Sequence, residues 1–180
     1  MQAARLRSRQ SVLIDAPLEF VWEYNLDLSR IADFHPRVDK VELIDGRSQR
    51  APGVGYKCYL RGGRHTCIER DVEVVPMERI VTALAEDSFG VARLLPDYRV
   101  ESTLKPEGGG RTKVEFRHYY SIRGWKARLF HWIAWRRIAK ESQATLNAMK
   151  RAIESLAAKA LPTGGGSAKP GVTPDRPSPC

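Results

Sequence analysis

The sequence has 180 residues, of which 42% are hydrophobic and 28% are charged, a composition typical of a globular protein. A chain of this length can bury roughly two thirds or more of its unfolded surface, so it needs neither metals nor disulfides to fold. Its three cysteines form no CxxC pair and no even-numbered disulfide framework, which indicates a reducing compartment.

The net charge of +9 is compatible with nucleic acid or an anionic membrane as a partner. Lys and Arg are scattered, however, without a long basic block or an RNA-binding aromatic signature, so no nucleic acid is expected. The basic start leads only into a short apolar run, residues 12–14, too brief for a signal peptide. Arg136 and Arg137 directly follow the most apolar stretch, residues 129–135, which argues against a transmembrane helix. We therefore expect a cytoplasmic protein.

The first elements are a strand and two short helices. Residues 11–15 are rich in β-branched and aliphatic side chains, which predicts a strand, and the proline after them suits the first turn of a helix. Apolar spacings of three and four predict that helix over residues 17–25. Asp27 is placed to cap a second short helix over residues 28–34, before the next proline.

From residue 38 the apolar period changes to two, and turn residues divide the region into six strands. The predicted strands cover residues 41–44, 54–60, 66–75, 80–85, 98–104 and 112–122. Because short turns join them, they favour an antiparallel meander over a parallel sheet.

A helical period returns after Gly124 and continues to Lys159, long enough to cross the sheet. Its apolar face consists of Ile138, Leu146, Met149, Ile153 and Leu156. Residues 161–180 are rich in Gly, Pro and Ser, so we expect a disordered tail there. The prediction is thus one α+β domain over residues 1–160, in which a curved antiparallel sheet wraps a long C-terminal helix around an apolar pocket.

Several short motifs resemble those of the START-like (SRPBCC) superfamily. The opening Ile14-Asp15-Ala16-Pro17 with Val21-Trp22 is similar to its "I-x-A-P…V-W" pattern. Further motifs are Asp27 with Phe34-His35-Pro36, Gly53 and Gly55 before a strand, residues 74–80 around Pro76, and Gly109-Gly110-Arg111-Thr112 before Val114. The resemblance covers about residues 8–159 and is strongest to the polyketide cyclase/dehydrase and lipid-transport branch. These motifs are mainly structural turns, so they identify a fold better than an activity.

That resemblance implies a helix-grip fold, with about seven strands around the C-terminal helix and a hydrophobic cavity between them. It implies binding of a hydrophobic small molecule such as a lipid, sterol, quinone or polyketide. Some members catalyse cyclisation or dehydration, which makes an enzyme of that type the alternative. A membrane-associated lipid or quinone carrier is a second alternative.

Strand alternation nominates the cavity wall, because side chains of equal parity share a face. Three rows of mixed apolar and polar residues suit a small-molecule pocket. Together with residues of the helices, the candidate ligand-binding residues are His35, Tyr56, Cys58, Arg70, Tyr98, Ser102, Phe116, His118, Tyr120, Trp132 and Met149.

His118 is the candidate for catalysis, because an inward histidine can act as a general acid or base near neutral pH. The structural alternative is a core histidine bonded to a hydroxyl of Tyr98 or Tyr120. Arg70 shares parity with apolar neighbours and could bind an anionic or carbonyl group, or form a salt bridge at a strand end. His35 could lie at the pocket mouth or merely end a helix.

No metal or cofactor is expected, because the four histidines lack ligand spacing and no nucleotide-binding or catalytic-triad motif is present. The segment of residues 125–140 interleaves aromatic and basic side chains. Its members are Trp125, Phe130, Trp132 and Trp135 with Lys126, Arg128, Arg136 and Arg137. Such a helix either closes the pocket as a partly buried lid or lies on an anionic membrane.

Overall fold

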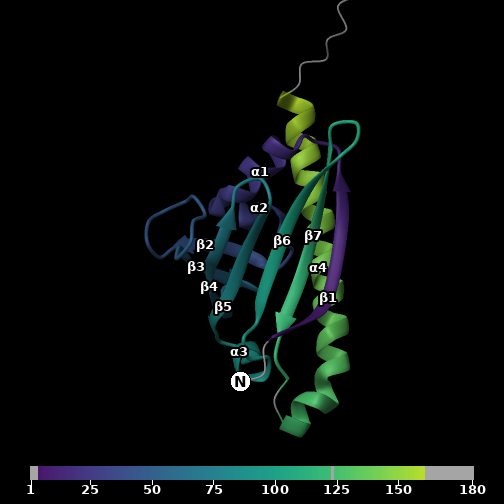
Figure 1. Cartoon of the computed structure of the whole chain (residues 1–180). Coiled ribbons are helices and arrows are strands. Elements are labelled where there is room, and N and C mark those ends of the chain that lie inside the picture. The colour runs from purple at the N-terminus through teal and green to yellow at the C-terminus, as the bar shows by residue number, and fades with distance from the viewer. Residues whose placement is uncertain (1–3, 123, 161–180) are drawn as a thin grey trace, which may run out of the picture.

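The computed structural model describes residues 4–122 and 124–160. Seven strands form one sheet that curls around a long C-terminal helix (Figure 1). This is the predicted α+β helix-grip architecture, with short helices following the first strand. The expected tail, residues 161–180, lies outside the described residues, so its disorder stays a prediction.

The chain order confirms the sequence pattern of one strand, two short helices, six strands and a long helix. The elements are β1 (Arg5–Ile14), α1 (Leu18–Leu26), the 3-10 helix η1 (Leu28–Arg30), α2 (Ile31–Phe34), β2 (Val38–Leu43), β3 (Gly55–Leu60), β4 (His65–Val75), β5 (Arg79–Asp87), α3 (Val91–Leu94), β6 (Arg99–Glu107), β7 (Arg111–Tyr120) and α4 (Gly124–Ala160).

Helix α3 is the one element of this set that the sequence did not predict, since four residues are too few to show a period. It begins after Gly90, whose φ of 83° is left-handed. The Asp87 carboxylate accepts hydrogen bonds from the backbone N–H groups of Val91 and Ala92, at 2.9 and 2.6 Å. These hydrogen bonds to the Asp87 carboxylate stabilise the short helix, which has no hydrophobic period of its own.

The sheet order is β1-β7-β6-β5-β4-β3-β2, and every neighbouring pair is antiparallel. Strands β2 to β7 therefore form the predicted meander. The last strand, β7, also pairs with the first strand, β1, and Val12 lies opposite Val114. The short helices of residues 18–34 lie between β1 and β2 in the chain, at one end of the sheet (Figure 1).

Helix α4 packs along the concave side of the sheet. Leu146, Met149 and Ile153, spaced by three and four residues, are buried in the core, and Leu156 is partly buried against it. The helix is also tied to β1, because the Lys150 ammonium group donates to the carbonyl oxygen of Leu13 at 2.6 Å. Within the described residues, we find no helix with the combined length and apolar character that a membrane span requires.

Candidate functional site

A cavity of about 590 Å³ lies between the concave sheet, the short helices and α4. Its walls are mainly apolar and include Ile31, Phe34, Ile80, Val100 and Ile138. Arg61, Phe89 and Arg137 also line it and are exposed, which places its opening between the β3–β4 turn, the segment before α3, and α4.

Strand alternation determines which predicted residues reach this cavity. Of the candidate ligand-binding residues, the cavity is lined by His35, Tyr56, Cys58, Tyr98, Ser102, Phe116, His118 and Met149. They come from β3, β6, β7 and α4, from the residue just after α2 and from the residue just before β6, so the fold brings together residues that are far apart in the sequence.

Three of the candidates do not line the cavity. Arg70 points to the outer side of β4, and its guanidinium group donates to the carbonyl oxygen of Gly53 at 2.6 Å. Tyr120 is fully buried behind the wall, where its ring stacks on Tyr98 and its hydroxyl lies 3.3 Å from Nε2 of His131. Trp132 is on the solvent side of α4.

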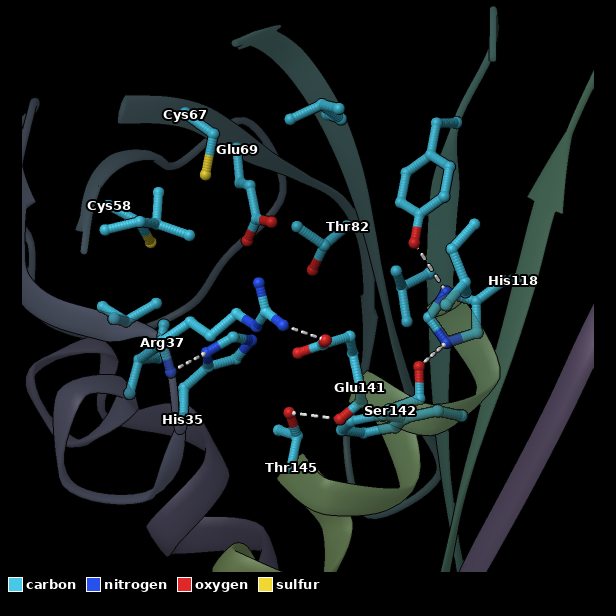
Figure 2. A pocket seen from close by; sticks show the side chains of 18 of the residues that line it. His35, Arg37, Cys58, Cys67, Glu69, Thr82, His118, Glu141, Ser142 and Thr145 are labelled. Carbon is cyan, nitrogen blue, oxygen red and sulfur yellow. Dashed lines mark hydrogen bonds and ion pairs between the residues drawn. The ribbon is translucent and has the colours of Figure 1, made fainter. Parts of the chain in front are cut away.

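His118 lies in the middle of a hydrogen-bonded chain on the cavity wall. Its Nδ1 is 2.8 Å from the Tyr98 hydroxyl and its Nε2 is 2.6 Å from Oγ of Ser142, a residue of α4 (Figure 2). Burial lowers the pKa of His118 to about 4, so the ring is neutral near pH 7. A neutral imidazole donates through one nitrogen and accepts through the other, and both nitrogens are engaged here.

In this row of hydrogen bonds, the hydroxyl groups are better placed than the imidazole to bond with a ligand. Tyr98 and Ser142 both line the cavity, and a hydroxyl that bonds to His118 retains a further hydrogen-bonding capacity. Burial also raises the pKa of Tyr98, so its phenol stays protonated. The sequence pointed to the Tyr98 partner, whereas Ser142 was not predicted.

A second polar cluster centres on Arg50, in the segment between β2 and β3. Its Nη1 lies 2.7 Å from Oδ1 of Asp71, and 3.3 Å from the hydroxyl oxygens of both Tyr56 and Thr82. Thr82 donates to the same Asp71 oxygen at 2.7 Å. The carboxyl group of Asp71 is fully buried, and burial raises its pKa while Arg50 opposes that rise.

Glu69 extends this cluster toward the cavity. The Tyr56 hydroxyl donates to its Oε2 at 2.8 Å, and both residues line the cavity. Burial is the largest influence on Glu69 and raises its pKa, whereas the bond from Tyr56 and the charge of Arg50 act in the opposite direction. The cluster thus presents a phenol, a carboxyl group and a guanidinium group to the same cavity.

A third polar group lies between α2 and α4. The Arg37 side chain forms an ion pair with Glu141 of α4, and the Arg37 backbone N–H donates to Nδ1 of His35 at 3.3 Å (Figure 2). Burial lowers the pKa of His35 to about 4, against the opposing effect of Glu141. His35 therefore lines the cavity as a neutral, hydrogen-bonded ring.

Ser102 provides a polar atom of a different kind. Its hydroxyl oxygen is buried and has no hydrogen-bond partner within the described part of the chain, although the residue lines the cavity. A buried hydroxyl without a partner is unfavourable, so this atom is suited to bond with a bound molecule.

Over residues 4–122 and 124–160, no three His, Cys, Asp or Glu side chains come together as a metal site would require.

The polar residues that sequence reasoning missed are Arg37, Arg50, Glu69, Asp71, Thr82, Glu141 and Ser142. For Glu69 a signal existed, because Cys58 pairs with Cys67 and Tyr56 with Glu69 across the β3–β4 hairpin. Directly opposed residues share a face, so an inward Tyr56 requires an inward Glu69 and an outward Arg70. The apolar Ile68 and Val72 suggested the opposite parity.

Comparison with known proteins supports the same assignment of fold. The model of the family described as "Polyketide cyclase / dehydrase and lipid transport" matches residues 5–154. No curated protein matches the chain.

Solved structures with the same fold include an aromatase/cyclase, ZhuI, from a Streptomyces species. It is 19% identical, with a TM-score of 0.67 over 90% of this chain and 99% of that chain. The TTHA0849 protein of Thermus thermophilus is 15% identical, with a TM-score of 0.65 over 83% and 97%. A START superfamily protein from Mycobacterium smegmatis is 12% identical, with a TM-score of 0.57 over 89% and 100%. At these identities the likeness concerns the fold alone.

Proposed function

The chain belongs to the polyketide cyclase/dehydrase and lipid-transport family, and on that premise we propose that it binds a hydrophobic small molecule between its sheet and α4. The observation that carries the proposal is the cavity of about 590 Å³, mainly apolar but with polar groups at several places on its wall. Small-molecule sites are typically about 300–1,000 Å³ and combine apolar walls with a few orienting polar groups.

The polar groups indicate what kind of molecule fits. Arg50 faces Asp71 and Arg37 faces Glu141, so the two cations that are least exposed on the wall are both already paired with carboxylates. A ligand with a full charge would gain little from such paired groups. Hydroxyl or carbonyl oxygens, in contrast, can bond with Ser102 and Tyr98. We therefore propose a neutral molecule with an apolar body and several oxygens, in the range of lipids, quinones and polyketides.

Two measurements test this proposal. Native mass spectrometry of the purified protein should show an additional bound mass that organic extraction removes. Titration with the neutral fluorophore N-phenyl-1-naphthylamine should show saturable binding that competes with the extracted molecule.

A cavity-filling variant distinguishes internal from surface binding. Ser102→Phe places a ring in the cavity and should weaken binding of the fluorophore at least about tenfold, since it removes volume and a polar partner. Val72→Phe is the matched control, because Val72 is exposed on the outer face of β4. Equal affinity in both variants would contradict binding in the cavity.

The second candidate is an enzyme of the cyclase/dehydrase type, favoured by the chain of Tyr98, His118 and Ser142. A neutral His118 can accept the proton of one hydroxyl while that hydroxyl oxygen abstracts a proton from a bound carbonyl compound, and the imidazolium can then return its proton. Several polar side chains within hydrogen-bond reach of each other are what an enzyme requires and a simple carrier does not.

Incubation with a linear 1,3,5-tricarbonyl compound, followed by chromatography and mass spectrometry, tests this candidate. Enzyme activity predicts a cyclised or dehydrated product that His118→Phe abolishes while leaving affinity for the compound nearly intact. Binding without any product would favour the binding function, and loss of affinity for the compound together with loss of product in His118→Phe would assign His118 a structural role.

A further inference from the structure

The first half of α4 exposes an apolar stripe on the side of the helix that faces away from the cavity. Leu129, Trp132 and Ile133 are 58%, 56% and 49% exposed, and their spacing places them on one helical face. Ala134 and Ile138, on the opposite face, line the cavity. The stripe is therefore separate from the ligand site, although both belong to the same helix.

The position of this segment makes the stripe accessible to a flat surface. Figure 1 shows the first turns of α4 extending beyond the strand ends, at the end of the molecule where α3 lies. Trp125, in the first turn, is also exposed. Several exposed apolar side chains gathered at a projecting end differ from the single apolar residues that are scattered over the surface of most globular proteins.

Basic side chains border the stripe. Arg128, Arg136 and Lys140 are exposed, and the Arg136 guanidinium carbon lies 5.4 Å from the centroid of the Trp132 ring. Residues 124–140 contain five basic residues and no acidic one. Apolar and tryptophan side chains flanked by Arg and Lys are the pattern of a helix that lies in a bilayer interface.

We propose that the face formed by Leu129, Trp132, Ile133, Arg128 and Arg136 docks on an anionic lipid bilayer. A second copy of the chain fits less well, because it would bring two basic surfaces of a protein with net charge +9 together. An anionic bilayer matches both parts of the face, since its headgroups attract the arginines and its acyl boundary accepts the apolar side chains. The inference is independent of what the cavity holds.

Vesicle sedimentation with the full chain tests the proposal. The protein should pellet with vesicles of phosphatidylcholine and phosphatidylglycerol at about 20 mM salt, and much less at about 500 mM salt or with phosphatidylcholine alone. Arg128→Gln with Arg136→Gln should lower the partition coefficient roughly thirtyfold. The charge-matched control is Lys105→Gln with Lys159→Gln, two exposed positions outside the face, which should bind nearly as the wild type does.

The apolar part of the face is tested separately. Leu129→Ser with Trp132→Ser should abolish pelleting, whereas Ile44→Ser with Val72→Ser, exposed positions elsewhere on the surface, should not. Circular dichroism must show the same helix content in each variant. Absence of charge-dependent pelleting would overturn the proposal, as would a wild-type dimer in analytical ultracentrifugation that only the Leu129 and Trp132 changes dissociate. If these variants still bind N-phenyl-1-naphthylamine, their cavity is intact. A change in vesicle binding can then be interpreted independently of the proposed cavity function.

Discussion

Oγ of Ser142 on α4 lies 2.6 Å from Nε2 of His118 on β7, so the helix and the last strand are joined by a polar contact on the cavity wall. The other ring nitrogen is held by the Tyr98 hydroxyl at 2.8 Å. His118 is thereby fixed in orientation, and it in turn fixes the two hydroxyl groups that face the cavity.

Replacing His118 with Phe should destabilise the protein, because the hydroxyl groups of the buried Ser142 and the half-buried Tyr98 each lose a partner. The cost of leaving such groups unsatisfied is about 1–3 kcal/mol in the free energy of unfolding. His118→Gln keeps a donor and an acceptor and should cost less. Urea titration of both variants measures the difference. An unchanged midpoint in His118→Phe would show that the hydrogen bonds of His118 with Tyr98 and Ser142 contribute nothing to stability.

The depressed pKa of His118 also predicts a pH dependence of stability. Because its pKa is about 4 in the folded state against an ordinary value of 6.5, the unfolded state binds more protons between these values. Stability conferred by the neutral ring is therefore complete above about pH 6.5 and decreases as the pH falls toward 4. From about pH 7 to about pH 5 the loss is about 2 kcal/mol. His118→Gln should lack this part of the decrease, and parallel curves for both proteins would contradict the assignment.

The fold was predictable because period and turn signals agree along most of the chain. Alternation in residues 54–60 and 98–104 correctly predicted inward Tyr56, Cys58, Tyr98 and Ser102. The apolar face of α4 likewise contained enough information to place Leu146 in the core. These predictions succeed because one-sided burial leaves a period in the sequence.

The polar site was less predictable, because its members follow from pairing rather than from period. Glu69 and Asp71 face inward between apolar residues that point outward, so parity by hydrophobicity selected Arg70 instead. Arg50 lies in a loop, where no hydrophobic period indicates the direction of its side chain. The short helix α3 and the contact of Ser142 with His118 required three-dimensional information.

Removing Arg50 should strongly destabilise the protein. Its partner Asp71 has no exposed side-chain surface, so Arg50→Met leaves an uncompensated buried carboxylate at a cost of about 3–5 kcal/mol. Asp71→Asn in the same background should recover part of the loss. Arg79→Met, which removes solvent-accessible ion pairs with Glu73 and Glu78, is the control and should leave the urea midpoint near that of the wild type.

Two leucines of α4 provide a direct check on how the helix is oriented. Leu146 is fully buried against the sheet, so Leu146→Ala should lower the free energy of unfolding by about 2–5 kcal/mol. Leu129 is mostly exposed on the same helix, and Leu129→Ala should change it by about 0.5 kcal/mol or less. Similar losses of stability in both variants would contradict the finding that the Leu146 face of α4 packs on the sheet while Leu129 is exposed.

The thiols of Cys58 and Cys67 should report on occupation of the cavity. They lie opposite each other on β3 and β4, are buried, and both line the cavity. The hydrogen bond to Cys67 and burial raise the pKa of Cys58, which disfavours the reactive thiolate. In a Cys180→Ser background, iodoacetamide should therefore react with the folded protein far more slowly than with the protein in guanidinium chloride.

Saturation with N-phenyl-1-naphthylamine should slow the reaction further if the fluorophore lies in the cavity, since it would cover both thiols. Val72→Cys supplies an exposed thiol on the outer face of β4 whose labelling should be rapid and independent of the fluorophore. Rapid labelling of Cys58 and Cys67 in the folded protein would contradict their burial, and protection of Val72→Cys would indicate binding outside the cavity.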